Sequence, residues 1–370
     1  MKAVVLNEEQ KFECKEVTDR KCASTDVRVE VYAAGICGSD IHKIQSGWRY
    51  PLPAVMGHEF SGVVVEIGQE VTNVAVGQSV VGIPLLPCHQ CEYCQKGQFG
   101  MCIDYQMIGT HHYGAFAENV VLPAKNVLPI GEMDFEEAAM IEPLAVSLHG
   151  VMNLRPQIGD VAVVFGVGTI GLLTIQCLFL AGVKDIIAVD INDDKLAEAK
   201  ALGCRYTVNS LVENLEERVF NYTDGVGADL ALECAGSKIT QEQCLLVTRK
   251  QGKVGYLGIA YSDVLLKERA FENIFRKELT LQGFWNSYSA PFPGKEWTNA
   301  IDFINQGRFK LNSLISHRYP LQQVKEAFEM ILSRKESYNK VMILPKEVIA
   351  NESCSENSSR LRQNAVSGTN

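Results

Sequence analysis

The sequence lacks any Lys/Arg-rich run, and its 370 residues carry a formal net charge of −9 at pH 7. Phosphate backbones and anionic lipid surfaces would on average be repelled, so we expect neither nucleic-acid nor membrane binding. The opening residues, MKAVVLNEEQKFECKE, hold no apolar stretch of the length that a secretory signal needs. We therefore expect a cytoplasmic protein. Internal repeats are also absent.

One uncharged run, residues 161–183 (VAVVFGVGTIGLLTIQCLFLAGV), is long enough to span a bilayer. Its pattern favours a different interpretation, because three glycines interrupt it after a β-branched stretch. A buried strand, a turn and a buried helix account for that punctuation better than a membrane span does.

Apolar residues make up 46% and charged residues 21% of the chain, which is ordinary for a globular protein. Short valine-rich runs separated by glycine and proline dominate the first 150 residues and are typical of a β-rich, barrel-like domain. From about residue 155, strands alternate with helices, which indicates a parallel, doubly wound sheet. We predict an α/β protein with one domain formed by residues 1–154 and 285–346, a nucleotide-binding domain at 155–284 and a disordered tail at 347–370.

Twelve cysteines are present, although disulfides are rare in the reducing compartment that we expect. Four of them cluster in LPCHQCEYCQKGQFGMC, at Cys88, Cys91, Cys94 and Cys102. Four thiolates complete the tetrahedral shell of a structural zinc ion and leave no position open for chemistry. A redox pair would need only two cysteines, and bacterial ferredoxin spacing ends differently. We predict a structural zinc site.

A second set of metal-binding residue types lies outside that cluster. Cys37 occurs in AAGICGSDIHK and His58 in VMGHEFSG. With one carboxylate, either Glu59 or Glu142, they would hold a zinc ion whose fourth position stays open to water or an alcohol, as catalytic zinc requires. Spacing alone does not decide the matter, because a lone cysteine and a lone histidine are more often core residues.

The uncharged run also contains a dinucleotide-binding pattern. Its G-x-G-x-x-G motif consists of Gly166, Gly168, Thr169, Ile170 and Gly171 with the intervening Val167, between a predicted strand and helix. Such glycines let backbone N–H groups and the helix N-terminus approach a pyrophosphate. Asp190 ends the next strand, where a carboxylate binds the ribose hydroxyls and repels the 2′-phosphate of NADP. We therefore predict NAD as the cofactor.

These motifs together resemble a known family. GHEFSGVVVEIGQEV, from residue 57, is similar to the GHE-x2-G-x5-G-x2-V signature of the medium-chain, zinc-dependent alcohol and polyol dehydrogenases, and GICGSD and the four-cysteine loop occur where that family has them. The resemblance covers about residues 1–345. It implies a GroES-like β-barrel catalytic domain, a Rossmann nucleotide domain, two zinc ions per subunit, and a homodimer or homotetramer.

The resemblance also implies residue roles. Cys37, His58 and Glu142 correspond to catalytic zinc ligands, and Glu59 to the ligand that some polyol members use, so the two carboxylates can exchange. His42 resembles the histidine that ends a proton relay in several alcohol dehydrogenases, and Ser39, two residues after Cys37, is placed to pass the proton outward. A turn residue at Ser39 and a surface histidine at His42 stay open as alternatives. The expected reaction is oxidation of a secondary alcohol to a ketone, with zinc activating the hydroxyl and the nicotinamide accepting hydride.

Three stretches, among them RKELTLQGFWNSYSAPFPGKEW, are most similar to members that oxidise galactitol 1-phosphate to tagatose 6-phosphate. A phosphorylated polyol needs cations near the cleft, and the candidates are Lys277, Arg276, Arg49, His111 and His112. Arabitol phosphate and the unphosphorylated polyols sorbitol, xylitol and butanediol stay open as alternatives. A remoter alternative is a non-catalytic binding protein on the same scaffold.

Overall fold

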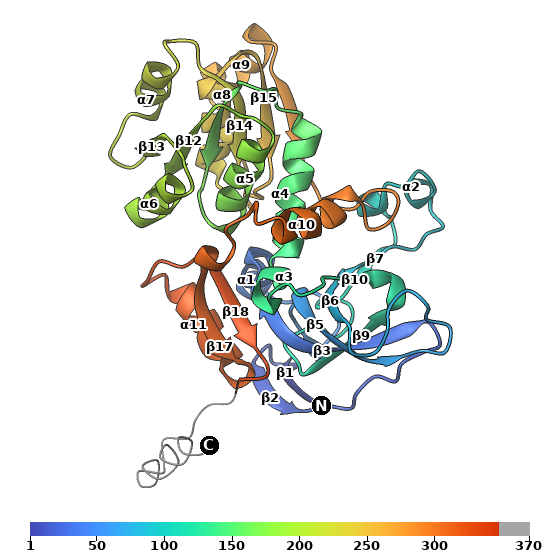
Figure 1. Cartoon of the computed structure of the whole chain (residues 1–370). Helices are drawn as coiled ribbons and strands as arrows, with labels where there is room; N and C mark the ends of the chain where they lie inside the picture. The colour runs from blue at the N-terminus through green and yellow to red at the C-terminus, as the bar shows by residue number, and fades with distance from the viewer. Residues whose placement is uncertain (348–370) are drawn as a thin grey trace, which may run out of the picture.

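The structure, a computed structural model, describes residues 1–347. The disordered tail predicted for residues 347–370 therefore lies, apart from Glu347, outside the described residues. Two bodies meet at the long helix α4 (Ile141–Leu154), and the chain returns to the first body at its C-terminal end (Figure 1). One body is built around a parallel sheet and the other mainly around antiparallel strands.

The antiparallel body contains, among the described residues, a seven-stranded and a three-stranded sheet. Its strands alternate buried and more exposed residues, as in β3, where Val27, Val29 and Val31 are fully buried. The larger sheet has the order β10-β6-β5-β3-β18-β17, and β9 also pairs with β3. Its strands are β3 (Asp26–Gly35), β5 (Glu59–Ile67), β6 (Ser79–Gly82), β9 (Asn119–Pro123), β10 (Val127–Pro129), β17 (Ile315–Pro320) and β18 (Lys340–Leu344).

The smaller elements of this body surround the sheets. The order β2-β1-β4 joins β1 (Lys2–Leu6), β2 (Phe12–Glu16) and β4 (Ala54–Val55), while β7 (Leu85–Leu86) pairs with β8 (Gln106–Met107). The helices are α1 (Gly38–Gln45), α2 (Glu92–Gln95), α3 (Phe135–Ala139) and α11 (Val324–Ser333), with 3-10 turns η1 (Phe99–Met101), η2 (Ala124–Asn126), η3 (Asn312–Leu314) and η4 (Leu321–Gln323).

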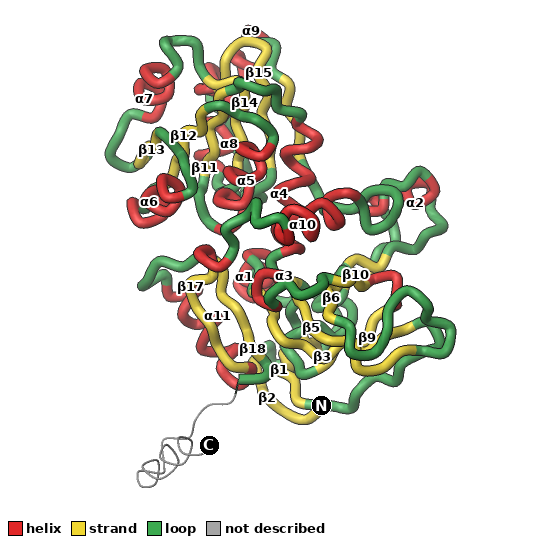
Figure 2. The backbone as a smooth tube through the Cα atoms, in the orientation of Figure 1, coloured by secondary structure: helices red, strands yellow, loops and turns green. Residues whose placement is uncertain are grey.

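The second body is a parallel sheet with helices on both faces (Figure 2). Its strand order, β13-β12-β11-β14-β15-β16, is the Rossmann order 3-2-1-4-5-6, so the predicted doubly wound sheet is confirmed. The strands are β11 (Val161–Phe165), β12 (Asp185–Asp190), β13 (Tyr206–Asn209), β14 (Ala228–Glu233), β15 (Thr248–Tyr256) and β16 (Thr280–Gly283). The helices that flank it are α5 (Thr169–Leu180), α6 (Asp193–Ala201), α7 (Leu215–Tyr222), α8 (Lys238–Val247) and α9 (Glu268–Arg276), whereas α10 (Lys295–Asn305) packs against α4.

The uncharged run at 161–183 folds as expected into a buried strand, β11, and a largely buried helix, α5. None of the helices within residues 1–347 has the length and apolar character needed to traverse a bilayer. One apolar core connects β11 and α5 with α4 and with residues of the four-cysteine loop. The two bodies therefore share packed side chains.

Candidate active site

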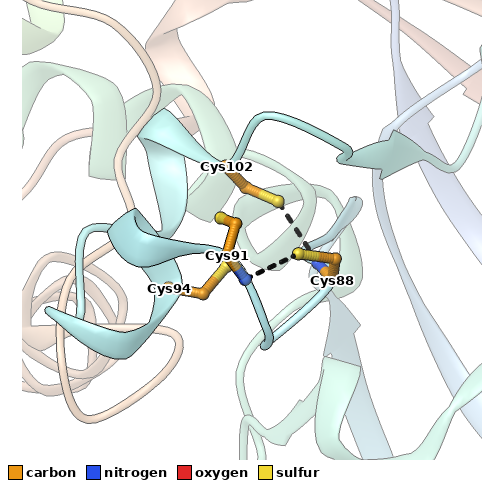
Figure 3. Close-up of side chains that lie close together, drawn as sticks. All are labelled: Cys88, Cys91, Cys94 and Cys102. Atoms are coloured by element: carbon orange, nitrogen blue, oxygen red, sulfur yellow. Dashed lines mark hydrogen bonds between the residues drawn. The ribbon is translucent and has the colours of Figure 1, made fainter.

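The four predicted zinc-binding cysteines converge between β7 and β8 (Figure 3). Their sulfur atoms all lie within 4.8 Å of one another, and none forms a disulfide. Backbone N–H groups already point at these sulfurs: Cys91 N donates to Cys88 Sγ at 3.4 Å, and Cys88 N donates to Cys102 Sγ at 3.3 Å. The cluster fits a structural zinc ion, since four sulfur donors fill a tetrahedral shell.

Local electrostatics favour thiolates on part of this cluster. The backbone N–H of Cys94 is the main cause that lowers the pKa of Cys91 to about 6. Backbone N–H groups of Gln90 and Cys91 likewise lower the pKa of Cys88. A thiolate is the form that binds zinc, so the turn prepares two of the four donors before metal arrives.

Cys37 is the N-cap residue of α1, so its position is fixed by the start of a helix. Its sulfur accepts a hydrogen bond from Ser39 N at 3.5 Å, and its own N–H donates to Asp40 Oδ2 at 3.2 Å. This reciprocal capping arrangement fixes the sulfur at the start of the helix.

His58 lies directly before β5 and is buried against Asp40, with 3.4 Å between His58 Nδ1 and Asp40 Oδ1. Burial disfavours a charged ring, but the charges of Asp40 and Cys37 outweigh it and raise the pKa of His58 well above its ordinary value. Surroundings that favour a proton here also favour a cation. The contact of Nδ1 with a carboxylate leaves Nε2 for a metal, as in carboxylate–histidine–zinc arrangements.

The structure brings Cys37, His58 and Glu59 together, with one donor atom of each within 4.8 Å of the others. Glu142, the second residue of α4, is buried beside them but outside that limit. Burial is the main cause that raises the pKa of Glu142 to about 7, and the Glu59 charge adds to it. This donor set of a sulfur, an imidazole and a carboxylate fits a zinc ion with an open coordination position.

Lys340, the first residue of β18, reaches the same site. Its ammonium contacts the Glu59 carboxylate and donates to Ile36 O at 3.1 Å, and both charged side chains are at most 4% exposed. A Cβ at Gly35 would overlap Glu59 Oε2, so the pair needs glycine at that position. One oxygen of Glu59 is thereby held by β18.

The predicted glycine motif forms a tight turn between β11 and α5. Gly166 has φ of +78°, and a Cβ there would lie 2.5 Å from the Cβ of Ala235. A Cβ at Gly171 would overlap Gly166 O, while Gly168 is the N-cap residue and Thr169 and Ile170 form the first helical positions. A close approach of backbone to ligand fits the pyrophosphate of a dinucleotide.

Asp190 stands at the carboxyl end of β12, next to this turn. Its Oδ2 accepts from Val167 N at 2.8 Å, and its Oδ1 accepts from Ile191 N at 2.7 Å and Asn192 N at 3.0 Å. The carboxylate therefore also holds the glycine turn in place, a role that the sequence did not indicate.

A cavity of about 530 Å³ adjoins the carboxyl ends of the parallel strands. The segment after β15, residues 257–262, lines it together with Phe284 and Trp285. Tyr261 of this wall stacks on His42, five residues after Cys37, with ring planes 15° apart. Ser39 and His42 lie one turn apart on α1, on a common face. Their role as a proton relay stays a prediction.

Two of the predicted phosphate-binding cations do not lie at this cavity. Arg276 pairs with Glu272 on α9, and Lys277 donates to Leu246 O at 3.0 Å and Thr248 O at 2.7 Å. Both residues come before β16, and the cavity wall follows the other end of that strand. α9 lies at the end of the parallel sheet that is remote from the antiparallel body (Figure 1). That hypothesis is wrong for both residues, because their donors are satisfied at the other end of the strand.

Of the other predicted cations, His111 lies near a lysine that the sequence did not indicate. Lys43, one residue after His42, donates to Thr110 Oγ1 at 2.8 Å and lies over the rings of Trp48 and Tyr50. The Tyr50 ring meets His111 edge to face at 5.2 Å. Of the remaining two, Arg49 is exposed in the loop of Tyr50, and His112 contacts the side chain of Gln106.

Sequence reasoning also missed Asp40 and Lys340. A signal for Asp40 exists, because a carboxylate three residues after an N-cap position completes a capping box. Lys340 offered none, since a lysine that opens the apolar strand KVMIL is normally a solvated strand end.

An open metal site beside a Rossmann sheet defines a metal-dependent, dinucleotide-linked dehydrogenase. Family models agree with this geometry: the alcohol dehydrogenase GroES-like domain matches residues 23–132, and the zinc-binding dehydrogenase model matches residues 169–306. The chain belongs to the zinc-binding alcohol dehydrogenase family, and the predicted family, fold class and zinc dependence are confirmed.

Similar proteins include several polyol dehydrogenases. Galactitol 1-phosphate 5-dehydrogenase of Escherichia coli (strain K12) is 35% identical over 86% of this chain and 92% of its own length. Sorbitol dehydrogenase of Halalkalibacterium halodurans is 33% identical over 83% of this chain and 88% of its own length. D-arabitol-phosphate dehydrogenase of Enterococcus avium is 32% identical over 89% of this chain and 91% of its own length.

Two solved structures extend the comparison. Galactitol-1-phosphate dehydrogenase from Escherichia coli superposes with a TM-score of 0.88 at 34% identity, covering 93% of this chain and all of that one. A zinc-binding dehydrogenase from Sinorhizobium meliloti 1021, solved bound to NADP, superposes with a TM-score of 0.85 at 30% identity, covering 93% of this chain and 99% of that one.

Proposed function

We propose that this dehydrogenase oxidises a secondary hydroxyl of a phosphorylated polyol with NAD, and that its substrate is galactitol 1-phosphate and its product tagatose 6-phosphate. The observation that carries the reaction type is the donor set of a half-buried Cys37 and the buried His58 and Glu59 in a chain with a dinucleotide turn. The similarity to a galactitol 1-phosphate dehydrogenase at 35% identity supports the substrate.

Different residues have different roles in the proposed reaction. When bound, zinc supplies a Lewis acid for the substrate hydroxyl oxygen, and the nicotinamide supplies the hydride acceptor. Cys37, His58 and one of Glu59 and Glu142 would hold the ion, and Asp40 orients the His58 ring. Ser39 and His42 carry the hydroxyl proton outward along α1.

Asp190 supports NAD rather than NADP. Its carboxylate lies at the end of β12, where the two ribose hydroxyls of a bound dinucleotide would lie, and a 2′-phosphate would meet a fixed negative charge. The three backbone hydrogen bonds that it accepts keep the charge in place.

Lys43 supports a phosphate group on the substrate. Its ammonium, the Thr110 hydroxyl and the His111 ring form a group of donors beside Trp48 and Tyr50. Because His111 Nδ1 accepts from Met107 N at 3.1 Å, a neutral His111 ring carries its proton on Nε2. Donors next to aromatic faces suit a polyol chain that ends in phosphate.

A second candidate, an unphosphorylated polyol such as sorbitol, also has support. Lys43 Nζ lies 3.9 Å from Asp40 Oδ1, so part of its charge is already balanced within the protein. A sorbitol dehydrogenase is 33% identical to the chain.

Reduction of NAD and of NADP by the purified protein, measured with galactitol 1-phosphate, arabitol phosphate, galactitol and sorbitol, tests the proposal. The metal content of the same sample is determined in parallel. We expect two zinc ions per chain and the highest kcat/KM with galactitol 1-phosphate and NAD. Turnover of free galactitol or sorbitol at the same kcat/KM would overturn the phosphorylated substrate.

We also propose that the protein is a homo-oligomer. β16 is the edge strand of the parallel sheet, and all four of its residues are exposed, so its unpaired backbone groups offer an edge to a second copy. Light scattering coupled to size exclusion tests this, and Leu281→Lys on the exposed face of β16 should shift the protein toward monomers.

A further inference from the structure

The segment between β16 and α10 links the cavity to the metal-binding loop. We call Trp285–Phe292 the aromatic loop and Cys88–Cys102 the four-cysteine loop. The aromatic loop begins at the cavity wall, and beyond it the segment that leads to α10 passes beside the element α2 of the four-cysteine loop (Figure 1). Nothing in the expected chemistry requires this contact.

Three rings connect the two loops. His89 of the four-cysteine loop meets Phe99 edge to face at 5.5 Å and Phe292 at 5.8 Å, and Phe99 meets Phe292 at 5.3 Å. Edge-to-face pairs at these distances are attractive and directional. His89 directly follows Cys88, and Phe99 begins the 3-10 turn that ends before Cys102, so the four-cysteine loop supplies both rings.

The backbones of the two loops also touch. A Cβ at Gly97 would lie 2.5 Å from the Cβ of Ala290, and a Cβ at Gly100 would lie 3.3 Å from that of Asn286. Glycine at these positions of the four-cysteine loop therefore allows an approach that a larger residue would prevent. The contact spans most of the aromatic loop.

The start of the aromatic loop forms the cavity wall. Trp285 and its neighbour Phe284 both line the cavity, and the Phe284 ring meets His149 of α4 edge to face at 6.1 Å. Further along, Trp297 Nε1 donates to Ser287 O at 3.0 Å, which ties the loop to α10. The wall is thus held on one side by helices and on the other by the four-cysteine loop.

We propose that the four-cysteine loop positions the wall of this cavity, with His89 and Phe292 as positioning residues that hold the aromatic loop and through it Trp285. Neither residue touches the reacting atoms. The part of this inference that concerns substrate binding rests on the proposed function. The part that concerns the position of Trp285 does not.

Tryptophan fluorescence offers a direct readout. The sequence has three tryptophans: Trp48 and Trp297 are 6% and 0% exposed, whereas Trp285 is 48% exposed, so acrylamide quenching reports mainly on Trp285. The variants are Phe292→Ala and His89→Ala, which leave all eight predicted zinc ligands unchanged. Phe271→Ala is the matched control, because it removes one ring of the exposed Phe271–Phe275 pair on α9.

We expect both variants to retain two zinc ions and to show a quenching slope up to about twice that of the wild type, because Trp285 gains exposure as its support is lost. KM for the polyol should rise about three- to tenfold with kcat nearly unchanged, since uniform binding is lost. The control should match the wild type in both measurements.

Wild-type quenching in both variants would overturn the inference, and so would altered quenching with an unchanged KM, because the cavity would then not depend on the loop. If the wild type oxidises no polyol, the proposed function fails. The quenching comparison then still decides whether the four-cysteine loop positions Trp285.

Discussion

Removal of the Lys340 ammonium should destabilise the protein far more than removal of an exposed lysine nearby. Lys340 is 3% exposed, its partner Glu59 is 1% exposed, and the two charges meet in the interior between β18 and β5. Lys340→Met leaves the Glu59 carboxylate buried without its cation, which typically costs about 3–5 kcal/mol. Lys346→Met breaks an exposed pair with Glu30 in the same C-terminal segment and should cost less than about 1 kcal/mol.

Urea unfolding followed by circular dichroism measures both changes, with and without a zinc chelator. Zinc held by Glu59 would balance part of the charge that Lys340→Met exposes, so the loss should be larger after chelation. Lys340→Arg, which keeps the charge, should recover most of the stability. Equal losses for Lys340→Met and Lys346→Met would refute the argument that burial makes this ion pair important.

Three further predictions concern separate parts of the molecule. Cys94→Ser should lower bound zinc from two ions to one per chain, as measured by metal analysis, while zinc-dependent turnover survives in whatever fraction stays folded. Asp190→Ala should raise KM for NAD and Asp190→Arg should favour NADP; unchanged NAD kinetics in both would contradict the ribose assignment. Burial alone would raise the pKa of Glu296, but hydrogen bonds from His149 and Ser289 outweigh it and lower that pKa below 4.5. The resulting stability is present above pH 4.5 and lost as pH falls below it, so Glu296→Gln should flatten the acid loss of stability in a pH series of thermal melts.

The motifs that depend on local geometry could be predicted from the sequence. Gly166 has a positive φ, and Gly171 approaches Gly166 O, so both glycines are required within one strand–turn–helix unit. The four cysteines lie within a single loop, so their spacing carries the information. The same holds for the uncharged run, whose glycines separate a strand from a helix.

Groups that meet across long sequence separations could not be predicted. Lys340 and Glu59 are 281 residues apart, and their contact depends on β18 pairing with β3 beside β5, which no local pattern encodes. The choice of Arg276 and Lys277 as cleft cations failed for a related reason. Arg276 and Lys277 are close to Trp285 in sequence, but β16 lies between them. The two cations are therefore at the opposite end of that strand from Trp285.

The long-range contacts also explain why two zinc sites belong to one catalytic unit. Glu59, Asp40 and Lys340 bring three separate elements to the open site, so its shape depends on the antiparallel sheet being complete. The four-cysteine loop lies outside that sheet, and its contacts run instead to the segment that borders the cavity. A closed metal site is chemically inert, so its influence on turnover can pass only through such packing. Under the proposal made above, the two sites act differently, one through zinc ligands and the other through the position of a cavity wall.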